Sequence, residues 1–184
     1  MVTLETPRLL LRQWQADDLS RYVELFSDPE VTRYTMPVPP ERVEAFGTAF
    51  LAQWKDAGFG PFAAIHRQTG EWVGQIGLSR LAAWPHPESV EVGFELRRSW
   101  WGNGLATEGA TACLRFGFEH VGLGQIIAAT NPSNLASRRV LEKVGLTYQG
   151  LCHFPPGLES AWYLINRETW NRKHSSLQGA QHQR

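Results

Sequence analysis

Apolar residues recur with two different spacings between residues 90 and 120. From residue 90 to 96 every second side chain is apolar, a period of two that predicts a strand with one buried face. Further on, apolar residues recur at helical intervals, which predicts a helix that begins at Asn103 or Gly104 and ends near His120. The pattern therefore predicts a strand, a glycine-rich turn and a helix N-terminus in direct succession.

The same two periods divide the rest of the chain into strands and helices. Further strands are predicted at residues 8–13, 61–66, 72–78, 125–130, 147–153 and 159–165. Further helices are predicted to begin at Asp17, to run from about Glu41 to Asp56, and to extend from a cap at Ser133 or Asn134 to Gly145. This mixture of elements indicates an α/β or α+β protein.

Length and charge narrow the class of protein. The 184 residues suit one domain, which we assign to residues 1–173, and the polar residues 174–184 are predicted to be a disordered tail. Lys plus Arg and Asp plus Glu are 18 each, so the balanced charge favours neither nucleic acid nor an anionic membrane as partner. The sequence has no apolar run of about 18 residues and no signal-like N-terminus, so a cytoplasmic protein is expected.

Neither the cysteines nor the histidines are spaced as metal ligands. Cys113 and Cys152 are isolated, and Cys113 is predicted to be a small buried thiol on the inner face of the central helix. The six histidines are scattered along the chain without helical ligand spacing. We therefore predict no metal site.

The turn at Gly102 and Gly104 is a candidate anion site. The first amides of a helix lack intrahelical partners and lie at the positive end of the helix dipole, and glycine lets the backbone approach a bulky phosphate. A dinucleotide fingerprint requires glycine where the chain has Thr107, and a Walker A loop requires lysine where it has Ala110. From the two glycines alone, a tight strand-to-helix turn without a ligand is an equally good interpretation.

The amino-acid sequence around the turn resembles that of a known protein family. Ser99-Trp100-Trp101-Gly102-Asn103-Gly104 is similar to the acetyl-CoA loop Q/R-x-x-G-x-G/A of the GNAT acyltransferases, with Ser99 in place of the leading Gln or Arg. The run Trp-Trp-Gly-Asn-Gly-Leu-Ala-Thr-Glu resembles the W-G-x-G-hydrophobic-A-T-E segment of the RimJ/RimL-like branch, which includes ribosomal-protein N-acetyltransferases.

Two other segments carry the same resemblance. Residues 6–12 match the T-x-R-L-x-L-R opening of that branch, and residues 131–145 match its N-x-x-N-x-x-S-x-x-x-x-x-K-x-G segment. The resemblance covers about residues 3–172. It implies a GNAT fold with a central, mixed but mostly antiparallel sheet of about seven strands, about four flanking helices, and splayed strands that form a CoA cleft.

The resemblance also implies an N-acetyltransferase with acetyl-CoA as co-substrate and an amine as acceptor. The residues it assigns to the cofactor are Phe94, Leu96, Trp101, Gly102, Asn103, Gly104, Leu105, Ala106, Thr107, Asn131, Asn134 and Ser137. Those it assigns to the acceptor are Met36, Phe50, Trp54, Trp84 and Glu91, with His86 as a further candidate. For each of the apolar side chains, core packing is the alternative, and for His86 an ordinary surface loop.

Direct attack of an amine on a thioester sets three chemical tasks. A group must accept the amine proton, a donor must stabilise negative charge on the carbonyl oxygen, and a donor must hydrogen-bond the sulfur. The resemblance assigns them to Glu91, to a backbone N–H near Phe94 and to Ser137. Glu95, predicted on the same strand face as Glu91, is either the alternative base or an ordinary solvated or ion-paired side chain.

The sequence leaves the acceptor and a second function open. A protein N-terminal α-amine, an amino acid or an antibiotic would each serve as the amine. A CoA-binding sensor without catalysis is the alternative to an enzyme, although Glu91 and Ser137 favour catalysis. A homodimer is expected from the family resemblance alone.

Overall fold

The structure is a computed structural model that describes residues 2–34, 39–80, 89–154 and 157–173. Its strands are β1 (Thr3–Glu5), β2 (Leu9–Gln13), β3 (Pro61–His66), β4 (Trp72–Arg80), β5 (Val90–Leu96), β6 (Gln125–Thr130), β7 (Thr147–His153) and β8 (Glu159–Asn166). The main helices are α1 (Asp18–Ser27), α2 (Pro40–Ala57), α3 (Leu105–Phe116) and α4 (Leu135–Lys143). A 3₁₀ turn (Arg98–Trp100) precedes α3, a π-helical turn (Gly117–Val121) extends it, and residues 167–173 are helical.

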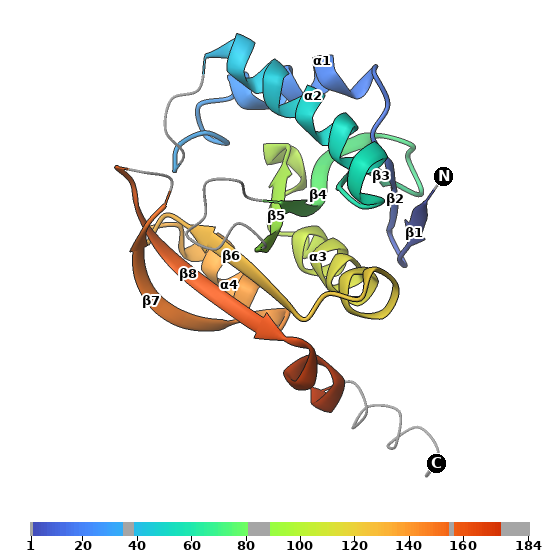
Figure 1. The fold of residues 1–184 in the computed structure, drawn as a ribbon. Helices are drawn as coiled ribbons and strands as arrows, with labels where there is room; N and C mark the ends of the chain where they lie inside the picture. Colours follow the sequence, from blue (N-terminus) through green and yellow to red (C-terminus); the bar gives the residue numbers. More distant parts are fainter. Residues whose placement is uncertain (1, 35–38, 81–88, 155–156, 174–184) are drawn as a thin grey trace.

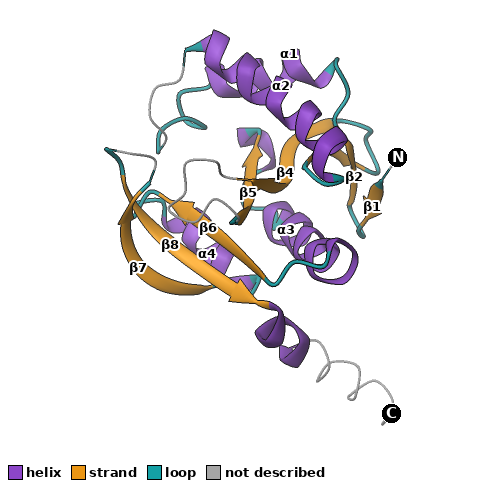
Figure 2. Ribbon diagram, viewed as in Figure 1, coloured by secondary structure: helices purple, strands orange, loops and turns teal. Residues whose placement is uncertain are grey.

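The strands form one sheet in the order β1-β2-β3-β4-β5-β6-β8-β7. Every neighbouring pair is antiparallel except β5 and β6, which run parallel and are registered at a single pair, Glu91 with Ile127. Beyond that pair the two strands continue without registered pairing, so they diverge toward their C-terminal ends, as Figures 1 and 2 show. This confirms the mixed, mostly antiparallel sheet and the splayed strands expected from the sequence.

Helices α1 and α2 pack against each other and cover one face of the sheet (Figure 1). A cluster of buried side chains joins them to it, made of Trp14, Tyr22, Leu25, Val43, Ala63 and Trp72. Helix α3 packs against β2, β4 and β5, and α4 packs against β6 and β7. These two helices share a larger core that contains Ile76, Leu114 and Leu141, together with the predicted buried thiol of Cys113.

The structure adds two elements that the hydrophobic pattern did not predict. Strand β1 holds only three residues and pairs Thr3 with Arg12 at the edge of the sheet, too short a segment for a period to show. The helical residues 167–173 follow β8 directly, where the sequence predicted only the end of a strand. The boundaries of β5, α3 and β6 agree with the predicted ones, and the predicted tail at 174–184 lies outside the described residues.

Candidate active site

The turn between β5 and α3 has the backbone geometry of an anion-binding loop. Gly102 and Gly104 both have φ of 76°, a left-handed conformation that other residues adopt only with strain, and Gly104 is the N-cap residue of α3. A Cβ atom at Gly102 would meet no other atom, so the conformation, rather than crowding within the protein, requires glycine there. The loop therefore presents the unpaired amides of α3 next to the splayed end of β5.

A side-chain network fixes this loop to the N-terminal strand. The Glu108 carboxylate accepts hydrogen bonds from Thr6 Oγ1 (2.6 Å), the Arg8 backbone N–H (2.8 Å) and Arg8 Nε (2.7 Å). Arg8 Nη1 also donates to the Asn103 carbonyl oxygen at 2.7 Å. Burial alone would raise the pKa of Glu108, but the hydrogen bonds from Thr6 and Arg8 lower it. The two segments that carry the family resemblance, residues 6–12 and 100–108, are therefore in direct contact with each other.

The residues in and around the loop that are predicted to bind the cofactor differ in how exposed their side chains are. Leu96 and Leu105 are buried in the core, so only their backbone groups are available to a ligand. Trp101, by contrast, is 44% exposed, and its indole N–H donates to the Leu96 carbonyl oxygen at 2.7 Å, which holds the ring against the end of β5. Phe94, Ala106 and Thr107 are partly buried.

The segment after β6 places the other predicted cofactor residues at the start of α4. Asn134 Oδ1 accepts from the Ser137 backbone N–H at 3.1 Å and caps the helix, which confirms Asn134 as the cap. Asn131 Oδ1 accepts from the Ser133 N–H at 2.9 Å and holds the turn that leads into it. Ser137 lies in the first turn of α4 and is partly buried. The side-chain oxygens of both asparagines therefore hold the turn, and their side-chain NH2 groups remain available to a ligand.

Glu91 stands where β5 and β6 part. One carboxylate oxygen accepts the backbone N–H of Ala129 at 3.1 Å, a donor that the diverging strands no longer pair. Burial raises the pKa of Glu91 to about 8; the Ala129 hydrogen bond lowers it, and the nearby Glu95 carboxylate raises it. A carboxyl group with such a pKa exchanges protons near neutral pH, as a general base requires.

Glu95 lies on the same face of β5, as predicted from the alternation. It is registered opposite Gln75 of β4, whose side-chain N–H group donates to the Glu95 carboxylate. Burial raises the pKa of Glu95, and the Gln75 hydrogen bond lowers it in part. Burial and the nearby Glu95 charge also raise the pKa of Tyr22, which belongs to α1. The two glutamates therefore face the side of the sheet covered by α1 and α2.

The aromatic residues predicted to line the acceptor site differ in position. Phe50 of α2 is partly buried, and its ring lies 5.5 Å from that of Trp14 and 5.7 Å from that of Tyr22. Trp54 is only 9% exposed, donates its indole N–H to the Pro61 carbonyl at 2.6 Å and belongs to the larger core. Met36, Trp84 and His86 lie outside the described residues. An acceptor role for these side chains stays a prediction.

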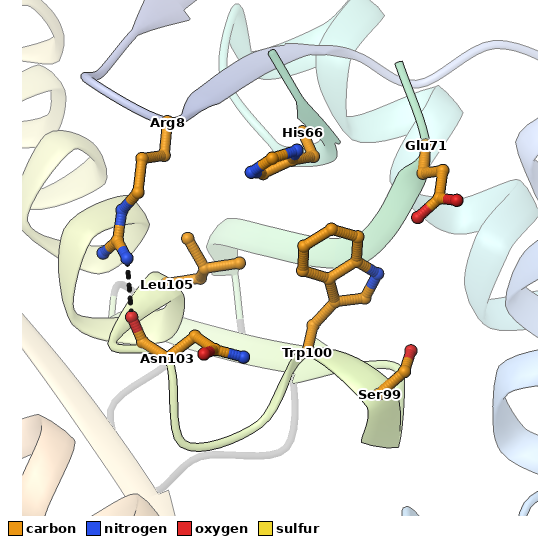
Figure 3. Close-up of a pocket in the computed structure, with 7 residues that line it drawn as sticks. All are labelled: Arg8, His66, Glu71, Ser99, Trp100, Asn103 and Leu105. Carbon is orange, nitrogen blue, oxygen red and sulfur yellow. Dashed lines mark hydrogen bonds between the residues drawn. The ribbon is translucent and has the colours of Figure 1, made fainter. Parts of the chain in front are cut away.

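A cavity of about 270 Å³ adjoins the loop on the side of β2 and β3 (Figure 3). It is lined by Arg8, His66, Glu71, Ser99, Trp100, Asn103 and Leu105. The His66 and Trp100 rings lie 4.7 Å apart in a tilted stack. His66 and Glu71 could not be predicted near this loop from the sequence, because they belong to a hairpin that only the fold brings there.

Within the described ranges 2–34, 39–80, 89–154 and 157–173, no helix has the length and apolar character needed to cross a membrane. In the same ranges, no three His, Cys, Asp or Glu side chains are grouped so that they would hold a metal ion.

Residues 8–147 match the acetyltransferase (GNAT) domain family, and the chain belongs to that family. A relative named uncharacterized N-acetyltransferase YoaA, from Bacillus subtilis, is 33% identical over 80% of this chain and 84% of its own. A second relative is the FsC-acetyl coenzyme A-N(2)-transacetylase of Aspergillus fumigatus, which is 31% identical over 92% of this chain and 78% of its own. The protein is accordingly an acetyl-CoA-dependent N-acetyltransferase.

Solved structures have the same fold. An acetyltransferase from Agrobacterium tumefaciens superposes with a TM-score of 0.80 at 27% identity, over 90% of this chain and 95% of that one. RimL, a ribosomal L7/L12 α-N-protein acetyltransferase solved in complex with coenzyme A, superposes with a TM-score of 0.74 at 14% identity, over 91% of this chain and 99% of that one. At that identity the second match supports the fold alone.

Proposed function

We propose that the protein transfers the acetyl group of acetyl-CoA to a primary amine by direct attack in a ternary complex. The observation that carries this proposal is the position of Glu91, whose carboxyl group lies where the splayed strands part and whose pKa is raised to about 8. The loop of left-handed glycines lies at the other end of the same strand.

We expect the diphosphate of CoA to bind at this loop. Neither Gly102 nor Gly104 carries a side chain that would shield the first amides of α3, and the Arg8 guanidinium lies beside Gly104. When bound there, acetyl-CoA supplies an activated acetyl thioester. Its pantetheine arm would then run from the loop toward Glu91 between the diverging strands β5 and β6, where the backbone of Phe94 and Leu96 would hold it.

In this reaction the chain's own groups perform the three tasks. Glu91 accepts a proton from the attacking nitrogen as the new C–N bond forms and the C–S bond breaks. A backbone N–H near Phe94 donates to the carbonyl oxygen as negative charge develops on it. The Ser137 hydroxyl donates to the sulfur, which needs only a hydrogen bond because a free thiol has a pKa of about 8.5.

The names of two similar proteins suggest two kinds of acceptor amine. The Aspergillus relative is named an FsC-acetyl coenzyme A-N(2)-transacetylase, whereas RimL is named a ribosomal L7/L12 α-N-protein acetyltransferase. The acceptor of this chain is therefore an amine either of a small molecule or of a protein N-terminus. The alternative, a CoA-binding sensor, shares the loop and lacks turnover.

Calorimetric titration with acetyl-CoA tests the loop, with Gly104→Val as the disrupted variant. Gly124→Val is the matched control, because Gly124 has no positive φ and a Cβ atom there meets no other atom. We expect wild type and the Gly124 variant to bind alike, and the Gly104 variant to bind at least about tenfold more weakly. A thiol-release assay over amines and peptides follows. Binding without turnover on any amine would favour the sensor, and no binding at all would overturn the proposal.

A further inference from the structure

We propose that the acceptor is a diamine whose second, non-reacting ammonium group is bound by Glu95 and Gln75 while its reacting amine lies near Glu91. This inference rests on the proposed function and names the substrate class of the same site. It is carried by a strip of β5 that comprises Glu91, Gly93 and Glu95, which we call the acidic strip.

The acidic strip is accessible. All three residues are partly exposed, and the space above Gly93 is open, since a Cβ atom built there would meet no other atom. Glu91 and Glu95 are four residue steps apart along an extended strand, so their Cα atoms lie roughly 13 Å from each other. A small ligand that lies over Gly93 would therefore reach both carboxylates.

Neither carboxylate of the acidic strip has a countercharge among the described residues. Two arginines that the sheet or the sequence places close to the acidic strip are already paired. Arg12, in the same cross-strand row as Gln75 and Glu95, binds Asp18 through two hydrogen bonds of 2.6 and 2.8 Å. Arg97, two residues after Glu95, binds Glu24 at 2.9 Å. Partly buried carboxylates without a countercharge are costly, so a cationic ligand would stabilise both of them.

Gln75 gives an independent indication of a donor-rich ligand. Its side chain is only 5% exposed and directs its N–H group at Glu95, yet its carbonyl oxygen Oε1 is buried and has no hydrogen-bond partner in the described part of the chain. An unpaired buried acceptor costs about 1–3 kcal/mol. An ammonium group carries three N–H donors, so it would pair with the Glu95 carboxylate and, with the Gln75 amide turned toward the acidic strip, would also satisfy Gln75 Oε1.

The chemistry of the acidic strip explains why a second cation is needed. A monoamine near Glu91 would leave Glu95 and the Gln75 oxygen unsatisfied, whereas a diamine would pair both. Burial raises the pKa of both glutamates because it destabilises their charged forms, and a bound ammonium group would offset this effect. Charge-assisted hydrogen bonds between ammonium and carboxylate are among the strongest polar contacts in proteins.

The test compares α,ω-diaminoalkanes with monoaminoalkanes of matching length. We expect kcat/KM for the preferred diamine to exceed that of its monoamine at least about tenfold, because a site built for a polar group rejects the analogue that lacks it. Glu95→Gln should reduce this ratio to near one. Glu44→Gln, which removes the same charge from an exposed position on α2, should preserve it.

A second variant blocks the acidic strip without changing its charge. Gly93→Val places a side chain in the open space between the glutamates, so the melting temperature should stay the same while kcat/KM for the diamine falls at least about tenfold. Equal kcat/KM for diamines and monoamines, or a preference that survives Glu95→Gln, would overturn the inference. So would a preference for peptides over diamines.

Diamine binding to the CoA complex, measured by calorimetry, separates this inference from the proposed function. Binding that depends on Glu95 without acetyl transfer would support a diamine-binding site on the acidic strip and refute the proposed function. Acetyl transfer to monoamines and diamines alike would do the reverse. The absence of any diamine binding would overturn the inference whatever the turnover.

Discussion

The pH dependence of stability should reveal the raised pKa of Glu91. A carboxyl group with a pKa of 4.5 in the unfolded chain and about 8 in the folded protein binds its proton more tightly when folded. Its contribution to stability is therefore fully present below about pH 4.5 and is lost as the pH rises through about 8. Glu91→Gln removes the titrating group and keeps an oxygen to accept the Ala129 amide hydrogen.

The shift sets the size of the effect. Each pKa unit corresponds to about 1.4 kcal/mol, so the full shift from 4.5 to about 8 has an upper bound of about 5 kcal/mol. Between pH 6 and pH 9 only about half of this range titrates, and Glu91 is partly exposed to water, which screens the charge. We expect wild type to lose about 1–2 kcal/mol relative to Glu91→Gln over that interval.

Urea unfolding at several pH values between 6 and 9 measures this difference. The variant should be as stable as wild type, or less, at pH 6 and gain on it steadily as the pH rises, with equal m values. A matched variant, Glu44→Gln, changes an exposed carboxylate and should follow the wild-type curve. Parallel curves for wild type and Glu91→Gln would show that Glu91 titrates normally, and the assignment of Glu91 as a base near neutral pH would lose its physical ground.

Three further predictions concern the cofactor side of the site. Glu108→Ala removes the acceptor of three hydrogen bonds and should cost about 2–4 kcal/mol in urea unfolding, more than Glu108→Gln does; equal losses would refute the role of the charge. Gly102→Ala should cost about 1–2 kcal/mol through its left-handed backbone and weaken acetyl-CoA binding in calorimetry, while Gly124→Ala changes neither. Ser137→Ala should lower kcat about tenfold or more at unchanged stability, and a variant with full kcat in a thiol-release assay would remove Ser137 from the reaction.

The backbone of the site could be predicted from the sequence because its constraints are local. A period of two places Glu91 and Glu95 on one face of β5, and two glycines at a strand-to-helix joint predict a tight turn, which the structure has. The Asn134 cap follows from the same local chemistry. None of these features depends on which strands are neighbours.

Features that depend on long-range pairing could not be predicted in the same way. Arg8 and Glu108 are 100 residues apart, so nothing in the sequence showed that their family segments meet. Gln75 reaches Glu95 only because β4 and β5 pair in that register. The spacing of Trp54 predicts that it lies on the inner face of its helix. Both hydrophobic cores contain aromatic residues, so the spacing alone does not show which core the Trp54 ring belongs to.

The acidic strip and the proposed base are linked by charge. The Glu95 carboxylate helps to raise the pKa of Glu91, and so favours a group that takes a proton from an attacking amine near neutral pH. A second ammonium bound at Glu95 would neutralise this influence and lower the pKa of Glu91 again. In the proposed reaction, then, a diamine gains affinity from Glu95 and meets a weaker base at Glu91, so its advantage over a monoamine should appear mainly in KM rather than in kcat.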